Sequence, residues 1–442
     1  MSSPPRLHWL TGIALLGTLT SCMDSPTEPN AGAEPSITQA ALVIVPPPFL
    51  GCVDGTLPDG ALSRICFPPN WNGDAVLWAH GYVSAFEPLA LPDDAVGGVP
   101  VQDIVLGLGY AYASTSYRDN GLIAVAAVDD LSQLSQAVEN VTGGVVRFKF
   151  LVGASEGGLA TALGLERAAQ HFDGGLVACA PAGSFRGQIN YLGDVRVLFD
   201  YFFPGVLPGS PISIPADLIA GWETVFAPAV AAALAANPGK TAQLVKVAGI
   251  AVDPTQPGSA VTSVLAALWY NIFATNDARA KLGGGNPYDN RTRIYTGSSN
   301  DFRLNLLVRR FRADASALAA LQPFEASGAL RRPAQGIHTK LDPVVPFWQQ
   351  QIYQVESLIH SGINFLSVSS PNYGHCAFDV DEVLASFAVL VLRVTARNLL
   401  ASARVFPDAA SVLRFERLAR AGGAEPIVIA DGARVGRTRA PR

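Results

Sequence analysis

Charged residues are scarce in this chain. They make up 15% of its 442 residues, hydrophobic residues make up 49%, and the formal net charge is −5. Proteins that bind nucleic acid carry clustered basic residues, so this balance gives no sign of a nucleic-acid partner. The large apolar share predicts a soluble globular body with a sizeable core, either as two or three domains or as one α/β domain with a large insertion.

Motifs for metals and phosphates are also lacking. No cluster of His, Cys, Asp and Glu has the spacing of a metal site, so neither a metal nor another cofactor is expected. The glycine run at 283–285 has no following Lys and Ser/Thr, and it therefore predicts a turn rather than a phosphate loop. Histidine is limited to six positions, which narrows the search for a catalytic base.

The N-terminus has no apolar run long enough to span a bilayer permanently. Arg6 precedes a short apolar stretch at 9–20, and Leu19-Thr20-Ser21-Cys22 offers a small-residue cleavage site. This pattern resembles a bacterial lipobox, which predicts a signal peptide at 1–21 and lipidation of Cys22. An ordinary secretory signal with an incidental Cys22 is the alternative. Both predict an extracytoplasmic protein, and the first predicts a lipid anchor in the membrane. Residues 22–48 are expected to form a flexible tether.

A Gly-x-Ser-x-Gly motif lies between an apolar run at 148–155 and a helical pattern at 156–172. Gly153 and Gly157 lack a β-carbon, so the chain can turn sharply and expose Ser155 at the carboxyl end of a strand. Among 42 glycines the motif alone would be an ordinary turn. The strand before it and the helix after it favour a nucleophile elbow, with Ser155 as the nucleophile.

Strand and helix patterns alternate on both sides of this motif. Strands are expected at 49–53, 61–67, 75–82, 109–117, 148–155, 175–180, 333–339 and 363–369, and helices at 128–141, 156–172, 346–361 and 381–400. Such alternation predicts an α/β fold with a doubly wound, mostly parallel sheet, built from residues 49–182 and 333–402. Ligands bind at the carboxyl ends of the strands in such a sheet.

The stretch at 183–332 has a different pattern. Proline-broken, alanine-rich helical segments at 216–237, 241–250 and 259–274 predict a helical cap inserted between two core strands. Its many aromatic residues fit either the core of the cap or a substrate pocket. Residues 403–442 are rich in arginine and are expected to form a peripheral C-terminal extension.

A serine hydroxyl needs a base that takes its proton and an acid that orients the base. After a nucleophile elbow the expected chain order is Ser, acid, His. His375 follows the last apolar strand on a glycine-containing loop and is the predicted base. Asp342, on the turn that leaves the preceding strand, is the predicted acid. Its alternatives are Asp301, Asp379 and Asp381.

Hydrolysis through a serine also requires N–H donors for the oxyanion that forms on the attacked carbonyl. The backbone N–H of Glu156, directly after the nucleophile, is one predicted donor. The second is the N–H of Tyr82, because Gly81 lets the loop after His80 approach a ligand closely. The Glu156 carboxylate is expected only to sit favourably at a helix start.

Four cysteines remain besides Cys22, an even number that favours disulfides outside the cytoplasm. Cys52 and Cys66 lie on two expected neighbouring strands and are predicted to pair. Cys179 and Cys376 lie near the ends of strands that approach the predicted catalytic face. A bridge between them and a pair of buried free thiols are both compatible with the sequence.

Four stretches together resemble the α/β-hydrolase superfamily over roughly residues 50–400. They are His80-Gly81-Tyr82, Gly153-Ala154-Ser155-Glu156-Gly157, Asp342-Pro343-Val344-Val345-Pro346 and Gly374-His375. The resemblance implies an eight-stranded-type sheet and a serine hydrolase mechanism through an acyl-enzyme, and the predicted substrate is a small-molecule ester. The chain is similar to secreted carboxylesterases and to prolyl-oligopeptidase-type catalytic domains, which leaves a peptidase or amidase as the alternative. The sequence indicates no oligomeric state.

His375-Cys376 is also similar to tannase and feruloyl esterase enzymes, in which cysteines beside the serine and the histidine form a bridge. Here Ala154 precedes Ser155, so that bridge cannot form in the same way. Because the chain departs from the family pattern here, Cys179 is the substitute partner considered for Cys376.

Overall fold

The computed structural model describes residues 47–395. The expected signal peptide at 1–21, Cys22, nearly all of the tether at 22–48, the last residues of the expected core and the extension at 403–442 lie outside the described residues. Among the helices described, none combines the length and the hydrophobicity that crossing a membrane requires.

An eight-stranded sheet organises the described residues, in the order β1-β2-β6-β3-β7-β8-β9-β10. The strands are β1 Gly51–Thr56, β2 Leu62–Phe67, β3 Ala75–Ala79, β6 Ala111–Thr115, β7 Lys149–Ala154, β8 Gly174–Ala178, β9 Ala334–Leu341 and β10 Phe365–Tyr373. β2 runs antiparallel to both of its neighbours, and all pairs from β6 to β10 are parallel. The predicted doubly wound, mostly parallel sheet is confirmed. A separate two-stranded sheet joins β4 Ala95–Val96 to β5 Val99–Pro100.

Helices cover both faces of the large sheet. The helices α2 Ala124–Thr142, α3 Glu156–Arg167 and α11 Trp348–Ser361 pack on one face, and α1 Val101–Gly107 and α12 Val380–Thr395 pack on the other. Because side chains alternate along a strand, Leu151 of β7 joins the first core and its neighbours Phe150 and Val152 join the second. The apolar runs in the sequence are therefore strands buried on both faces.

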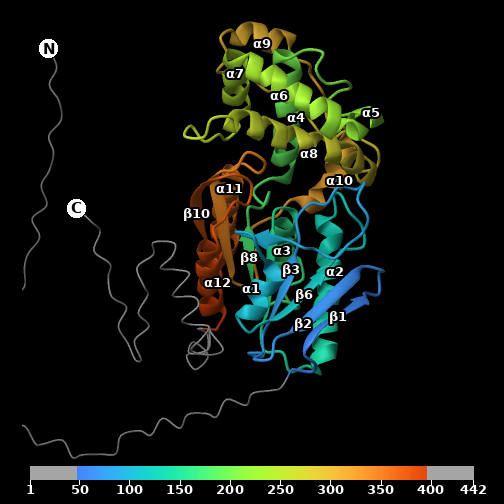
Figure 1. Ribbon diagram of the computed structural model, residues 1–442, viewed down its shortest axis with the longest axis vertical. Coiled ribbons are helices and arrows are strands. Elements are labelled where there is room, and N and C mark those ends of the chain that lie inside the picture. Colours follow the sequence, from blue (N-terminus) through green and yellow to red (C-terminus); the bar gives the residue numbers. More distant parts are fainter. Residues whose placement is uncertain (1–46, 396–442) are drawn as a thin grey trace, which may run out of the picture. The chain divides into compact units, whose positions relative to one another are not determined.

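A helical segment at 185–324 lies between β8 and β9 in the chain. Its helices are α4 Phe185–Phe202, α5 Ala216–Ala220, α6 Ala227–Ala236, α7 Pro238–Ala248, α8 Ser259–Lys281, α9 Asp301–Leu307 and α10 Ala315–Leu321, with a π-helical turn at Trp222–Phe226 and a 3₁₀ turn at Gln322–Phe324. Figure 1 shows most of these helices gathered at one end of the sheet. They share a separate apolar core that includes Phe199, Trp222 and Leu268.

This segment differs from the sequence prediction in several details: α9 and α10 were not predicted, and α8 runs beyond the predicted end at 274. The stretch at 216–237 is not one helix, because Val225 and Phe226 both donate to the Gly221 carbonyl and Pro228 has no N–H for the ladder. The long helix α4 was not predicted. Its signals are the Ser184 N-cap, which accepts a hydrogen bond from the Gly187 N–H, and apolar residues at helical spacing.

The predicted pairing of Cys52 with Cys66 is present. The two residues lie directly opposite each other on β1 and β2, and a disulfide joins them. β1 is exposed along its whole length at the edge of the sheet, so this bridge ties the outermost strand to its neighbour.

Candidate active site

Ser155 lies on a sharp turn between the end of β7 and the start of α3. Its φ of 57° and ψ of −122° are rare for a residue with a side chain, and such a conformation costs about 1–3 kcal/mol. A β-carbon on Gly153 would lie 2.2 Å from the Gly157 carbonyl oxygen, and one on Gly157 would lie 2.0 Å from the Ala79 carbonyl oxygen. Only glycine fits at both positions, so the motif is a steric requirement of this turn.

The structure brings Ser155, His375 and Asp342 into one hydrogen-bonded chain. The Ser155 hydroxyl lies 2.8 Å from His375 Nε2, and His375 Nδ1 lies 2.8 Å from Asp342 Oδ2. These residues follow β7, β10 and β9, whose carboxyl ends meet at one edge because the strands are parallel. With Nδ1–H donating to the carboxylate, Nε2 is left free to accept the hydroxyl proton.

Asp342 is fully buried and held from several sides. The backbone N–H groups of Val344 and Val345 both donate to its Oδ1 at 2.9 Å. His338 is also buried, with its Nε2 2.8 Å from the Val345 carbonyl oxygen and 3.6 Å from Asp342 Oδ2. Burial lowers the pKa of His338, which favours the neutral imidazole, and the contact with the carbonyl oxygen of Val345 requires Nε2–H as the donor.

The alternative acids lie in other surroundings. Asp301 accepts hydrogen bonds from the N–H groups of Gly297 and Ser298 in the helical segment. Asp379 contacts the Asn372 amide, and Asp381 lies in the first turn of α12. Among residues 47–395, the structure places Asp342 and no other carboxylate at hydrogen-bond distance from His375.

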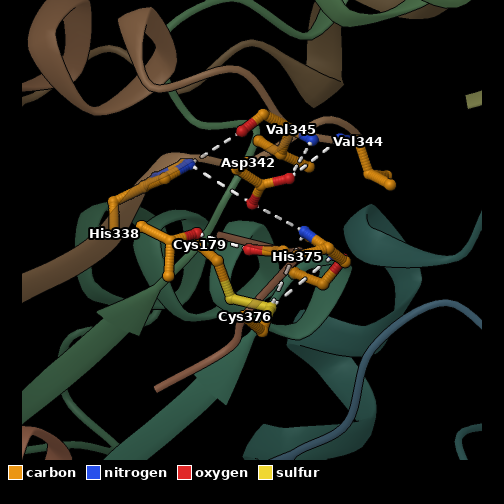
Figure 2. The surroundings of a disulfide bond; sticks show 10 residues. Cys179, His338, Asp342, Val344, Val345, His375 and Cys376 are labelled. Atoms are coloured by element: carbon orange, nitrogen blue, oxygen red, sulfur yellow. Dashed lines mark hydrogen bonds and ion pairs between the residues drawn. A yellow bond between two sulfur atoms is a disulfide. The ribbon is translucent and has the colours of Figure 1, made fainter. Parts of the chain in front are cut away.

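A disulfide joins Cys179, at the end of β8, to Cys376, directly after His375. Figure 2 shows this bridge close to His375, with Cys179 drawn between His338 and His375 in the view. Cys179 and Cys376 both have positive φ values, 44° and 52°, so each sits at a tight bend. The bridge fixes the loop that carries His375 to a central strand of the sheet, and of the two alternatives left open by the sequence the disulfide is the one present.

Three potential metal-ligand atoms gather at the same place. Cys179, His375 and Cys376 offer atoms within 4.8 Å of one another. The two sulfur atoms are joined in a disulfide and supply no thiolate, and both nitrogens of His375 have partners in Asp342 and Ser155. This donor set does not fit a metal ion.

The two residues predicted as oxyanion donors, Glu156 and Tyr82, line the same cavity as Ser155. Glu156 is the first residue of α3, where a backbone N–H has no carbonyl partner within its own helix. Gly81 lies so close to the nucleophile that a β-carbon on it would be 3.4 Å from the Ser155 β-carbon. Tyr82, the next residue, lines a cavity together with Ser155 and Glu156. Their role as donors stays a prediction.

The carboxylate of Glu156 has a different role from the expected one. It is buried, and its Oε1 accepts hydrogen bonds from the N–H groups of Ile123 and Ala124, at 2.8 and 3.1 Å. These groups belong to the start of α2, whereas Glu156 itself begins α3. The carboxylate therefore caps a neighbouring helix, a contact between residues distant in sequence that a local motif cannot reveal.

Glu156 makes stability dependent on pH. Burial raises its pKa from 4.5 to about 7, only partly opposed by the hydrogen bonds from Ile123 and Ala124. Between these values the folded chain keeps the proton that the unfolded chain releases, so stability falls as pH rises from 4.5 towards 7. We expect Glu156→Gln to flatten this fall. Between pH 4.5 and 7, the free energy of unfolding of the variant, relative to that of the unchanged protein, should rise by about 3 kcal/mol.

The measurement is urea unfolding of both proteins across this pH range. Asp74 and Asp130 also have pKa values raised to about 6 by burial, so part of the slope remains in the variant. Asp253→Asn serves as the control, because Asp253 is partly exposed and its side chain makes only local hydrogen bonds, to Thr255 and Gln256. If the free energy of unfolding of Glu156→Gln fell with pH as steeply as that of the unchanged protein, the prediction would be contradicted.

The helical segment contacts the loops that hold the site. From α4, the Tyr191 hydroxyl donates to the Pro343 carbonyl at 2.6 Å, and the Gln188 amide donates to the Val344 carbonyl at 2.7 Å. From α8, the ring of Tyr270 packs edge-on against His375 with the centroids 6.2 Å apart. The loop that follows Asp342 and the imidazole are thus both in contact with α4 and α8.

Comparison with solved structures finds similar folds at low sequence identity. Candida antarctica lipase A is 14% identical with a TM-score of 0.44, over 84% of this chain and 84% of that chain. A Pyrococcus furiosus esterase is 12% identical with a TM-score of 0.41, over 79% and 91%. Feruloyl esterase B from Aspergillus oryzae is 12% identical with a TM-score of 0.40, over 74% and 73%. No protein-family model and no curated protein matches the sequence. TM-scores this low support no conclusion about the site.

Proposed function

We propose that this chain, which has the α/β-hydrolase fold, is a serine hydrolase that cleaves carboxylic esters through an acyl-enzyme intermediate. The observation that carries the proposal is the hydrogen-bonded chain from Ser155 through His375 to Asp342, with both distances at 2.8 Å. The strained backbone of Ser155 supports it further, because strain at a half-buried polar residue is a common feature of functional sites.

In the proposed mechanism, Ser155 Oγ attacks the carbonyl carbon of the ester as His375 Nε2 takes the hydroxyl proton. Asp342 stabilises the imidazolium that results. The N–H groups of Glu156 and Tyr82 donate to the oxyanion of the tetrahedral intermediate. When the C–O bond breaks, His375 returns the proton to the leaving alcohol. Water, deprotonated by His375, then hydrolyses the acyl-enzyme and releases the acid.

We also propose that residues 183–332 act as a cap that restricts access to Ser155. The contacts of α4 and α8 with the catalytic loops support this role, and the His375 side chain is only 16% exposed. The two disulfides support an extracytoplasmic, oxidising location. We further propose that a lipid on Cys22 anchors the protein to the membrane.

The test is covalent labelling with a fluorophosphonate, followed by turnover of p-nitrophenyl acyl esters and of peptide anilides. A fluorophosphonate reacts with a serine only when a neighbouring base activates it. We expect labelling at Ser155 and turnover of the esters. Cleavage of anilides alone would replace the esterase by the peptidase or amidase alternative, and absence of labelling would overturn both.

The disulfide beside His375 provides a separate prediction. Replacing Cys179 and Cys376 together by serine should lower kcat about ten- to a hundredfold, because freeing this loop misplaces the imidazole and a shift of about 1 Å has such an effect. The control is the same double replacement at Cys52 and Cys66. It removes the disulfide between β1 and β2, which lie at the edge of the sheet, several strands away from β8. We expect it to lower stability by about 2–4 kcal/mol and to preserve kcat. Equal kcat in the two variants would contradict a positioning role.

A further inference from the structure

We propose that α4 and β9 jointly orient the catalytic acid, with Tyr191 of α4 and His338 of β9 as positioning residues for Asp342. This inference rests on the proposed hydrolysis, and it gives the cap a part in the reaction beyond restricting access. The turn at 343–345, directly after Asp342, carries the inference.

This turn holds one oxygen of the catalytic carboxylate. The N–H groups of Val344 and Val345 both donate to Asp342 Oδ1, and Pro343 has no N–H to satisfy. With Oδ1 held in this way, Oδ2 is the oxygen that faces His375 Nδ1 at 2.8 Å (Figure 2). The direction of the carboxylate therefore depends on where the turn lies.

The carbonyls of the same turn are held by side chains from two other elements. Three side chains donate to them, one to each carbonyl, and all three are buried. Tyr191 and Gln188 of α4 donate to the carbonyls of Pro343 and Val344 at 2.6 and 2.7 Å, and His338 of β9 donates to that of Val345 at 2.8 Å. Every backbone polar group of the turn thus has its partner in Asp342 or in one of these side chains.

The two proposed positioning residues are neutral donors. Burial raises the pKa of Tyr191, so the hydroxyl keeps the proton that it donates. Burial lowers the pKa of His338, which favours the uncharged ring. A cation at either position would compete with the imidazolium of His375 for the negative charge of Asp342. Neutral donors fix the turn and leave that charge to the catalytic base.

The cap and the catalytic acid are coupled through these contacts. Tyr191 and Gln188 lie three positions apart on α4 and therefore on one face of that helix. If α4 moved away alone, two buried carbonyls of the turn would lose their donors at a free-energy cost. The turn should therefore follow the helix, and a change in these contacts should alter kcat rather than substrate binding.

The experiment measures kcat, KM and the pH dependence of kcat/KM for p-nitrophenyl acetate in Tyr191→Phe and in His338→Met. Each change removes one donor and keeps most of the side-chain volume. We expect kcat to fall about ten- to a hundredfold, because a shift of about 1 Å has such an effect, with KM changed less than about threefold. The acidic limb of the pH profile should move to lower pH, since a misdirected carboxylate stabilises the imidazolium less. His338→Gln, whose amide can donate to the Val345 carbonyl, should recover most of the lost kcat.

Tyr295→Phe is the matched control. Tyr295 is a buried tyrosine of the same helical segment, and its hydroxyl donates to Asp194 at 2.7 Å. Like Tyr191→Phe, this change should lower the free energy of unfolding, but it should leave kcat and the pH profile unchanged. If Tyr191→Phe and His338→Met altered kcat and the pH profile no more than Tyr295→Phe does, their role would be structural only and the inference would be overturned.

Proton NMR tests the orientation of the acid without turnover. The downfield signal of His375 Nδ1–H reports the hydrogen bond to Asp342 and is assigned by its loss in Asp342→Asn. It should move upfield in Tyr191→Phe and in His338→Met and keep its position in Tyr295→Phe. If the fluorophosphonate does not label Ser155, the hydrolase proposal fails and this signal alone decides on the inference. An unchanged signal in both positioning variants would overturn it.

Discussion

Replacing Ser155 by alanine is expected to lower kcat for ester hydrolysis by about 10⁴–10⁶-fold, the largest effect of any single change in this chain. Without the hydroxyl no acyl-enzyme can form, and His375 loses the group that its Nε2 contacts at 2.8 Å. The fold should be unaffected, because the positive φ of this residue is strained with serine as it is with alanine. Steady-state turnover of an ester, with circular dichroism as the check on folding, measures this effect.

Ser132→Ala is the matched control for this change. Ser132 lies on α2, and its hydroxyl donates to the Val128 carbonyl of the same helix. We expect this variant to keep full activity and to be labelled by the fluorophosphonate at Ser155 as the unchanged protein is. If Ser155→Ala retained the turnover of the unchanged protein, Ser155 would not be the nucleophile and the proposed mechanism would be wrong.

Asp342→Asn should have the second largest effect, a fall in kcat of about 10⁴-fold. The asparagine oxygen can still accept the N–H groups of Val344 and Val345, so the turn should keep its shape. The amide NH₂ that replaces Oδ2 cannot accept from His375 Nδ1–H. The imidazole would then turn its Nδ1 lone pair to the amide and present Nε2–H to Ser155, which leaves the hydroxyl without a base.

This prediction is checked by kcat and by the rate of fluorophosphonate labelling, which should both fall. Asp301→Asn is the control, because Asp301 accepts its hydrogen bonds within the helical segment and lies away from His375. A kcat in Asp342→Asn within about tenfold of the unchanged value would indicate that Asp342 does not orient the base.

Local patterns predicted much of the fold correctly. The apolar runs of β3, β7 and β8 are buried along most or all of their length, as continuous hydrophobic strands in a parallel sheet must be. The elbow could be predicted equally well, because Gly153 and Gly157 are required by the turn itself. Helix boundaries in the segment at 185–324 were harder to predict from the sequence. There alanine-rich stretches have little periodicity, and a single proline or glycine decides where one helix ends.

By itself the sequence determined the position of the elbow at Ser155, the alternation that builds the sheet and the chain order of Ser155, Asp342 and His375, because each depends on neighbouring residues or on strand order. Only the tertiary structure decided which groups meet across long separations. It joins Cys179 to Cys376 over 197 residues and directs the Glu156 carboxylate to the start of another helix. It also leaves a cavity next to Ser155 that α4 and α8 line in part. These features arise from packing between elements far apart in the chain, and no local pattern records which faces will meet.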